Sequence, residues 1–146
     1  MKLNTTRFGE LDVEESSFFE FVSPILGYDN ERKFILIEHN ENSKFKWLQS
    51  VQTPSLAFAV TVAGLFGIDY SFELPDVTQE ELALETAEDI LALNIVVIPH
   101  SNPRSSTINL LAPIIVNLKT KKASQVILVN SNFEVDYPLF EKEVAC

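Results

Sequence analysis

The alternation of large and small side chains is most regular in the middle of the chain. Residues 45–62 read as two strands that meet at a turn at 53–55, and in the second strand large and small residues take opposite faces. From 66 to 74, large apolar residues alternate with small or polar ones, and Pro75 follows. The first pattern predicts two buried core strands, and the second predicts a half-buried antiparallel strand with its polar face in water.

Similar patterns predict extended segments along most of the remaining chain. They fall at 2–13 (a hairpin), 16–22, 33–39, 90–98, 107–118 and 125–129. In the segment 107–118, alternate residues from Ile108 to Leu118 form a core face. Pro113 cannot donate to a strand ladder, so a bulge, a bend or a change of partner is expected there.

One helix start is predicted, at Thr78-Gln79-Glu80-Glu81. This sequence fits a capping box with Thr78 as N-cap and Glu81 at N3. A polar turn at 86–89 limits the helix to about 79–85. The expected fold class is therefore mainly β, an antiparallel barrel-like sheet with one short helix.

The chain has 146 residues, which fits a single domain over 1–146 with a substantial core. The segment 130–146 carries scattered apolar residues and is expected either to dock on a barrel edge or to stay mobile. No apolar run approaches the roughly 20 residues of a membrane span. The N-terminus lacks the apolar stretch of a signal peptide, and the one cysteine is Cys146. These features predict a cytoplasmic protein with no membrane partner.

The net charge is −10, from 21 acidic and 11 basic residues. Direct binding to nucleic acid is not expected, because it requires clustered Lys and Arg. The acidic excess either favours approach to a basic partner or serves only solubility.

The sequence shows no motif that would supply catalysis. His39 and His100 have no Cys, Asp or Glu at metal-ligand spacing, and no Gly-rich phosphate loop or nucleophile elbow is present. We therefore expect no enzyme, no metal and no cofactor.

Two sets of residues are candidates for contacting a partner protein. The first is an acidic segment with no basic residue in it, and its candidates are Glu80, Glu81, Glu85, Glu88 and Asp89. The second set consists of Arg104, in the loop 100–106, and Asn109, which follows that loop. A solvated helix face is the better explanation of Glu80 and Glu81, since acids are favoured in a first helical turn. Taken alone, the second set is better explained by an ordinary hairpin connection.

Two long motifs resemble those of FliW, the bacterial flagellar assembly factor. Residues 45–58, FKWLQSVQTPSLAF, are similar to the central signature of that family, and 107–117, TINLLAPIIVN, to its second. The similarity runs from about residue 3 to 129. The chain departs from the family at 24–28, where Gly-Ile-Pro-Gly-Phe is usual, and at 63–64, where Asn-Pro is common.

The resemblance implies a non-enzymatic regulator. FliW proteins bind CsrA, a basic RNA-binding repressor, away from its RNA-binding face, and so relieve its block on flagellin translation. They also bind flagellin, which sequesters them. Two alternatives stay open, which are a dedicated flagellin chaperone without a CsrA role and a small-ligand carrier or enzyme built on a barrel mouth.

Overall fold

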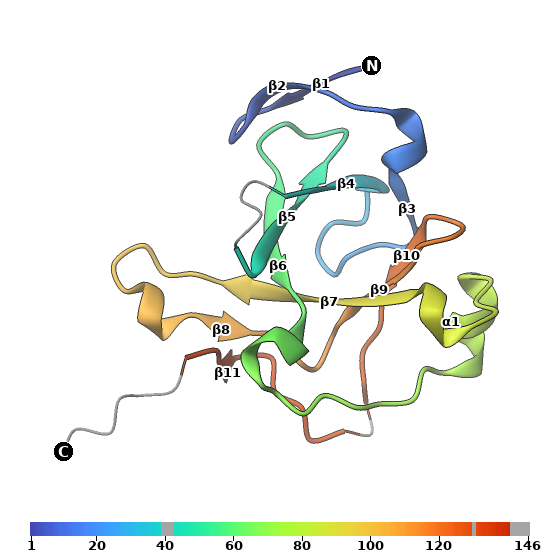
Figure 1. The fold of residues 1–146 in the computed structure, drawn as a ribbon, viewed down its shortest axis with the longest axis vertical. Helices are drawn as coiled ribbons and strands as arrows, with labels where there is room; N and C mark the ends of the chain where they lie inside the picture. The colour runs from blue at the N-terminus through green and yellow to red at the C-terminus, as the bar shows by residue number, and fades with distance from the viewer. Residues whose placement is uncertain (39–42, 130, 141–146) are drawn as a thin grey trace.

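Seven strands close into a barrel because β7 pairs along both of its edges. The order around the barrel is β7-β6-β5-β4-β3-β10-β9, and β9 pairs again with β7. All neighbours are antiparallel except β3 and β10. The computed structural model describes residues 1–38, 43–129 and 131–140 (Figure 1). The predicted mainly β, barrel-like fold with one short helix is confirmed.

The elements in chain order are β1 (Lys2–Thr5), β2 (Gly9–Asp12), η1 (Glu15–Ser17), β3 (Phe19–Ser23), β4 (Lys33–Ile37), β5 (Phe45–Ser50), β6 (Ala57–Thr61), η2 (Ala63–Phe66), α1 (Asp76–Glu81), η3 (Ala87–Asp89), β7 (Ile90–Val97), η4 (Pro103–Ser105), β8 (Thr107–Ile108), β9 (Ile114–Asn117), β10 (Lys122–Gln125) and β11 (Tyr137–Pro138), where η marks a 3-10 turn. The hairpin β1–β2 forms a separate two-stranded sheet, and β8 and β11 extend the barrel sheet beyond β7.

The barrel interior is filled by apolar side chains. Its buried members come from all seven barrel strands and include Phe21, Phe34, Leu48, Val60 and Ile114. The large face of β6 points into this interior, while Ala59 and Ala63 belong to a second cluster outside the wall. The predicted division of β6 into a large and a small face is therefore confirmed. A packed interior opposes the alternative of a ligand carried in the barrel mouth.

The segment predicted as a strand at 66–74 forms no ladder, so this prediction is wrong in one respect. The alternation of faces is present, since Tyr70, Phe72 and Leu74 pack inward while Asp69, Ser71 and Glu73 are exposed. The segment lies across the outer wall of the barrel instead of joining the sheet, because both edges of β7 and β9 are already paired.

The segment predicted as one strand at 107–118 is two strands, β8 and β9, that pair with different parts of β7. The predicted break at Pro113 is confirmed, since β8 ends at Ile108 and β9 begins at Ile114. Leu118 was expected on the core face but is 40% exposed, because the chain has already turned there.

Three other predicted segments are shifted. β3 begins at Phe19, after η1, instead of at 16, and the return strand β10 begins at Lys122 instead of 125. β4 ends at Ile37, and His39 lies outside the described residues.

The described part of the C-terminal segment docks on the barrel. β11 pairs with β8, and Leu139 is buried. Residues 130 and 141–146, with Cys146, lie outside the described residues.

Candidate interaction surface

The helix α1 begins three residues earlier than the capping box predicted. It starts at Asp76, and its N-cap is Pro75, which makes no side-chain capping bond. Thr78, the predicted N-cap, lies within the helix and is buried. Proline in extended conformation sets the entry to the helix, and Asp76 supplies the negative charge that a helix N-terminus favours.

The helix also ends four residues before the predicted end, in a Schellman motif. The amide of Ala83 donates to the carbonyl of Glu80, and the amide of Leu84 donates to that of Gln79. Ala83 takes the left-handed conformation, with φ +52°, which glycine usually supplies. The sequence contained no glycine to signal this end, which is why the prediction extended to Glu85.

Asn117 fixes the end of α1 to the barrel. It lies at the end of β9, is 1% exposed, and donates from Nδ2 to the carbonyls of Leu82 (2.7 Å) and Ala83 (3.2 Å). Its Oδ1 accepts from the amides of Lys119 (2.9 Å) and Thr120 (3.2 Å). One side chain therefore holds both the helix end and the turn after β9, and it orients the acidic segment on the barrel.

Two of the predicted acidic residues, Glu80 and Glu85, lie at one shallow groove. Asp76, which was not among the candidates, also lines it, together with Gln79 and Leu84. All three carboxylates are on exposed residues, so they are hydrated in the free protein. Their charge is available to a partner that approaches α1.

The other acidic candidates have different surroundings. Glu81 and Glu88 are exposed but do not line this groove. Asp89 is half-buried and accepts a hydrogen bond from the Thr86 hydroxyl (3.0 Å) in the turn of η3. Lys119 lies 3.3 Å from Glu85, with both side chains largely exposed, so this ion pair contributes little to stability.

The second candidate set lies far from the first. Figure 1 shows α1 near the start of β7 and η4, which carries Arg104, beyond its other end. Eight strand residues separate the two ends, roughly 25 Å. The structure therefore does not bring Arg104 and Asn109 together with the acidic segment.

Asn109 has a structural role in the turn after β8. Its Oδ1 accepts from the amide of Ala112 (3.0 Å), and its carbonyl accepts from Nδ2 of Asn94 (2.9 Å). These bonds shape the chain reversal between β8 and β9. Arg104 is exposed on η4.

The polar residues of the central motif also serve the fold. Gln49 is fully buried, and its Nε2 donates to the carbonyls of Ser50 and Pro54, both at 3.1 Å. The hydroxyl of Ser50 accepts from the amide of Thr53 (3.0 Å) and donates to a carboxylate oxygen of Glu31 (2.7 Å). This cluster holds the turn between β5 and β6, as polar residues near strand ends often do.

Tyr70 is the titratable residue whose environment sequence reasoning missed. Its hydroxyl donates to the carbonyl of Leu110 (2.5 Å). Burial raises the pKa of Tyr70 to about 12, against a smaller opposing effect of the Asn94 side chain. The bond anchors the segment before α1 to the turn between β8 and β9.

Within the described ranges, no group of three or more His, Cys, Asp or Glu side chains is placed to hold a metal ion. No helix found there is long and apolar enough to cross a membrane. The described surface carries an acidic patch beside grooves lined partly by apolar side chains.

The model of the FliW protein family matches residues 2–139. The chain belongs to the FliW family. Two FliW relatives, each named flagellar assembly factor FliW, illustrate the match. The one from Pseudothermotoga lettingae is 39% identical over 132 residues, which cover 90% of this chain and 84% of the relative. The one from Clostridium kluyveri is 38% identical, with both chains fully covered.

The fold agrees with a solved member of the family. A crystal structure of the flagellar assembly factor FliW superposes with a TM-score of 0.91 and 30% identity, covering 99% of this chain and all of that one. The resemblance predicted from the two motifs is therefore confirmed.

Proposed function

We propose that this chain is a non-enzymatic, cytoplasmic flagellar assembly factor that switches between two protein partners. In this proposal it binds the translational repressor CsrA and antagonises it allosterically, which relieves repression of flagellin translation. It also binds flagellin, and accumulated flagellin then withdraws it from CsrA.

The observation that carries the proposal is family membership over nearly the whole chain. Two relatives and a solved structure bear the name flagellar assembly factor FliW, and the similarity includes the complete barrel. The partners themselves are inferred from what FliW proteins are expected to do.

The charge of the surface supports a basic partner such as CsrA. The net charge is −10, and Asp76, Glu80 and Glu85 gather at one groove. Opposite charges on two proteins speed their encounter and fix their orientation, and the effect weakens with added salt. We accordingly propose Glu80, Glu81, Glu85, Glu88 and Asp89 as CsrA contacts.

Arg104 and Asn109 are proposed as a second, weaker contact set. Because they lie beyond the other end of β7, a partner that reaches both sets must span that strand. A separate partner such as flagellin is the simpler assignment for this second set.

The test is a charge reversal of α1 and the segment after it. The triple variant Glu80→Lys, Glu81→Lys, Glu85→Lys changes the net charge from −10 to −4, that is, by 3 × 2 units. We expect its affinity for CsrA at low salt to fall at least tenfold, because attractive contacts become repulsive. Binding is measured by calorimetric titration with CsrA from the same organism.

A matched variant separates local contact from total charge. Glu10, Glu14 and Glu15 are also exposed, and reversing them to Lys gives the same net charge of −4 on β2 and the segment that follows it, away from α1 (Figure 1). It should retain CsrA binding within about threefold. Equal affinities of the two variants would remove α1 from the proposed contact, and binding of flagellin alone would support the chaperone alternative.

A further inference from the structure

An extended segment without a partner strand crosses the outer wall of the barrel just before α1. Its inward side chains are held firmly, since the ring of Tyr70 lies 4.8 Å from that of Phe133 and 4.9 Å from that of Phe72. Within the described ranges, however, no backbone N–H or C=O group of residues 69–73 forms a hydrogen bond. The segment has the shape of a strand with both edges unpaired.

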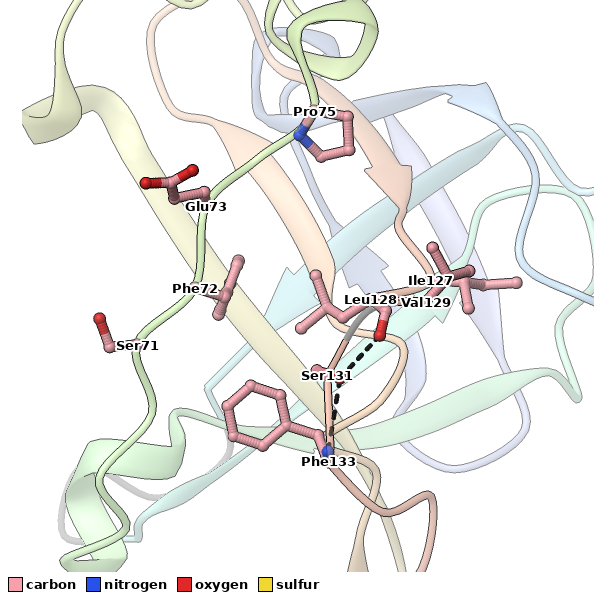
Figure 2. Close-up of a pocket in the computed structure, with 9 residues that line it drawn as sticks. All are labelled: Ser71, Phe72, Glu73, Pro75, Ile127, Leu128, Val129, Ser131 and Phe133. Carbon is pink, nitrogen blue, oxygen red and sulfur yellow. Dashed lines mark hydrogen bonds between the residues drawn. The ribbon is translucent and has the colours of Figure 1, made fainter.

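A groove lies on each side of this segment, and Phe72 lines both. The first groove, of about 390 Å³, is bounded opposite by Ile127, Leu128 and Val129, as Figure 2 shows. The second, of about 350 Å³, is bounded by Leu84, Ala87 and Ile90. Successive residues of an extended chain point their backbone groups to alternate sides, so both grooves are bordered by unpaired donors and acceptors.

We propose that residues 69–73 form a docking strand that accepts an extended peptide in the first groove. The incoming peptide pairs with the open backbone edge and so adds a strand beside the barrel. The docking strand is already extended and fixed by its aromatic contacts, so the protein loses little conformational freedom when the peptide binds.

The lining of the groove defines the chemistry of the occupant. Ile127 and Val129 are 45% and 76% exposed, so the peptide should carry apolar side chains at alternate positions. Glu73 is the charged residue among those that line this groove, and Asp76 and Glu80 follow on α1. The residues between the apolar ones should therefore include Lys or Arg. The occupant is an extended segment of another protein with alternating apolar and basic residues.

This inference does not depend on the identity of the partners proposed above. It concerns the mode of binding at a groove that adjoins, but is distinct from, the exposed face of α1. Unchanged CsrA binding in the charge-reversal test would count against the α1 contact but leave this inference standing, and failure of this inference would leave the partner switch standing.

The probe is a synthetic nonapeptide, acetyl-Thr-Val-Lys-Val-Thr-Val-Lys-Val-Thr-amide. It is titrated into the ¹⁵N-labelled full chain, and backbone amide shifts and hydrogen exchange are followed by NMR. We expect saturable binding below 1 mM, with shifts and slowed exchange centred on 69–73. No perturbation of 69–73 at 2 mM peptide would overturn the proposal.

Backbone pairing is tested with two N-methylated peptides. One carries N-methyl groups at odd positions and the other at even positions, so that each blocks one edge. At least one of them should bind tenfold more weakly than the parent peptide. Equal binding by all three would show that the groove recognises side chains alone and would refute strand addition.

The charge of the occupant is tested on the protein. Glu73→Lys should weaken binding of the lysine peptide at least threefold, whereas Glu15→Lys, a matched change on the remote η1, should not. Equal weakening by both variants would refute the local role of Glu73. Sedimentation without peptide gives the last check, because a dimer that protects 69–73 would assign the groove to a second copy of this chain.

Discussion

Replacing Asn117 with Ala removes the connection between the barrel and the end of α1. Asn117 makes four hydrogen bonds, two as a donor to Leu82 and Ala83 and two as an acceptor from Lys119 and Thr120. The carbonyl of Leu82 keeps only a weak contact with the hydroxyl of Thr120, at 3.4 Å. The variant therefore leaves several backbone groups without partners.

The size of the effect follows from these bonds. A net contribution of about 1 kcal/mol per bond gives an upper figure near 4 kcal/mol. The amides of Lys119 and Thr120 are on exposed residues and can bond to water in the variant, which reduces the loss. We expect the free energy of unfolding to fall by about 2–4 kcal/mol. For a domain of this size, at about 3 °C per kcal/mol, the melting temperature falls by about 6–12 °C.

The assay is urea denaturation followed by fluorescence of Trp47, the only tryptophan. The guanidinium of Arg7 lies 4.0 Å from the centre of its ring, so the signal reports an ordered barrel wall. Asn102→Ala is the control, because it removes a single exposed bond to Ser105 (2.8 Å) and should cost less than about 0.5 kcal/mol. A loss below 0.5 kcal/mol for Asn117→Ala would refute the anchoring role.

Two further changes follow from the same region. Ala83→Gly should raise the free energy of unfolding by up to about 1 kcal/mol in the urea assay, because Ala83 sits at φ +52°, and a decrease would contradict the assigned helix end. The raised pKa of Tyr70 means that the folded state holds its proton after the unfolded state has lost it, so stability is present below pH 10 and falls between pH 10 and about 12. Tyr70→Phe should remove a late step from the absorbance titration of the tyrosines, and an unchanged titration would contradict the burial of this hydroxyl.

The strands of the barrel could be predicted because local pattern and burial agree there. In β6 the large face fills the barrel interior, and the small face accommodates chain packed outside the wall. Pro113 signalled a break because proline lacks the donor that a ladder needs, and β8 and β9 do separate there.

The errors have two physical causes. The alternation at 66–74 reports one buried and one hydrated face, which a chain lying on a barrel wall satisfies as well as a strand in a sheet. The end of α1 depends on Ala83 in a left-handed conformation and on Asn117, which is 34 residues away in sequence. Neither is visible in local propensity.

The sequence could predict the acidic character of the candidate site but not how its side chains are arranged. The excess of acidic residues between 76 and 89 is plain in the sequence, but only folding gathers Asp76, Glu80 and Glu85 at one groove. Asn109 was a contact candidate because it follows the polar loop 100–106, yet its side chain shapes a turn. The docking strand was missed because the same residues were predicted to be paired.

The measurement that tests the central claim most directly is calorimetric titration of the chain with CsrA, free and saturated with its target RNA. The partner-switch account predicts tight binding to free CsrA and weaker, but not abolished, binding to the RNA complex, since an allosteric antagonist and the RNA occupy different faces. Flagellin added beforehand should reduce binding to CsrA. No heat of binding to free CsrA at low salt would contradict the proposed function.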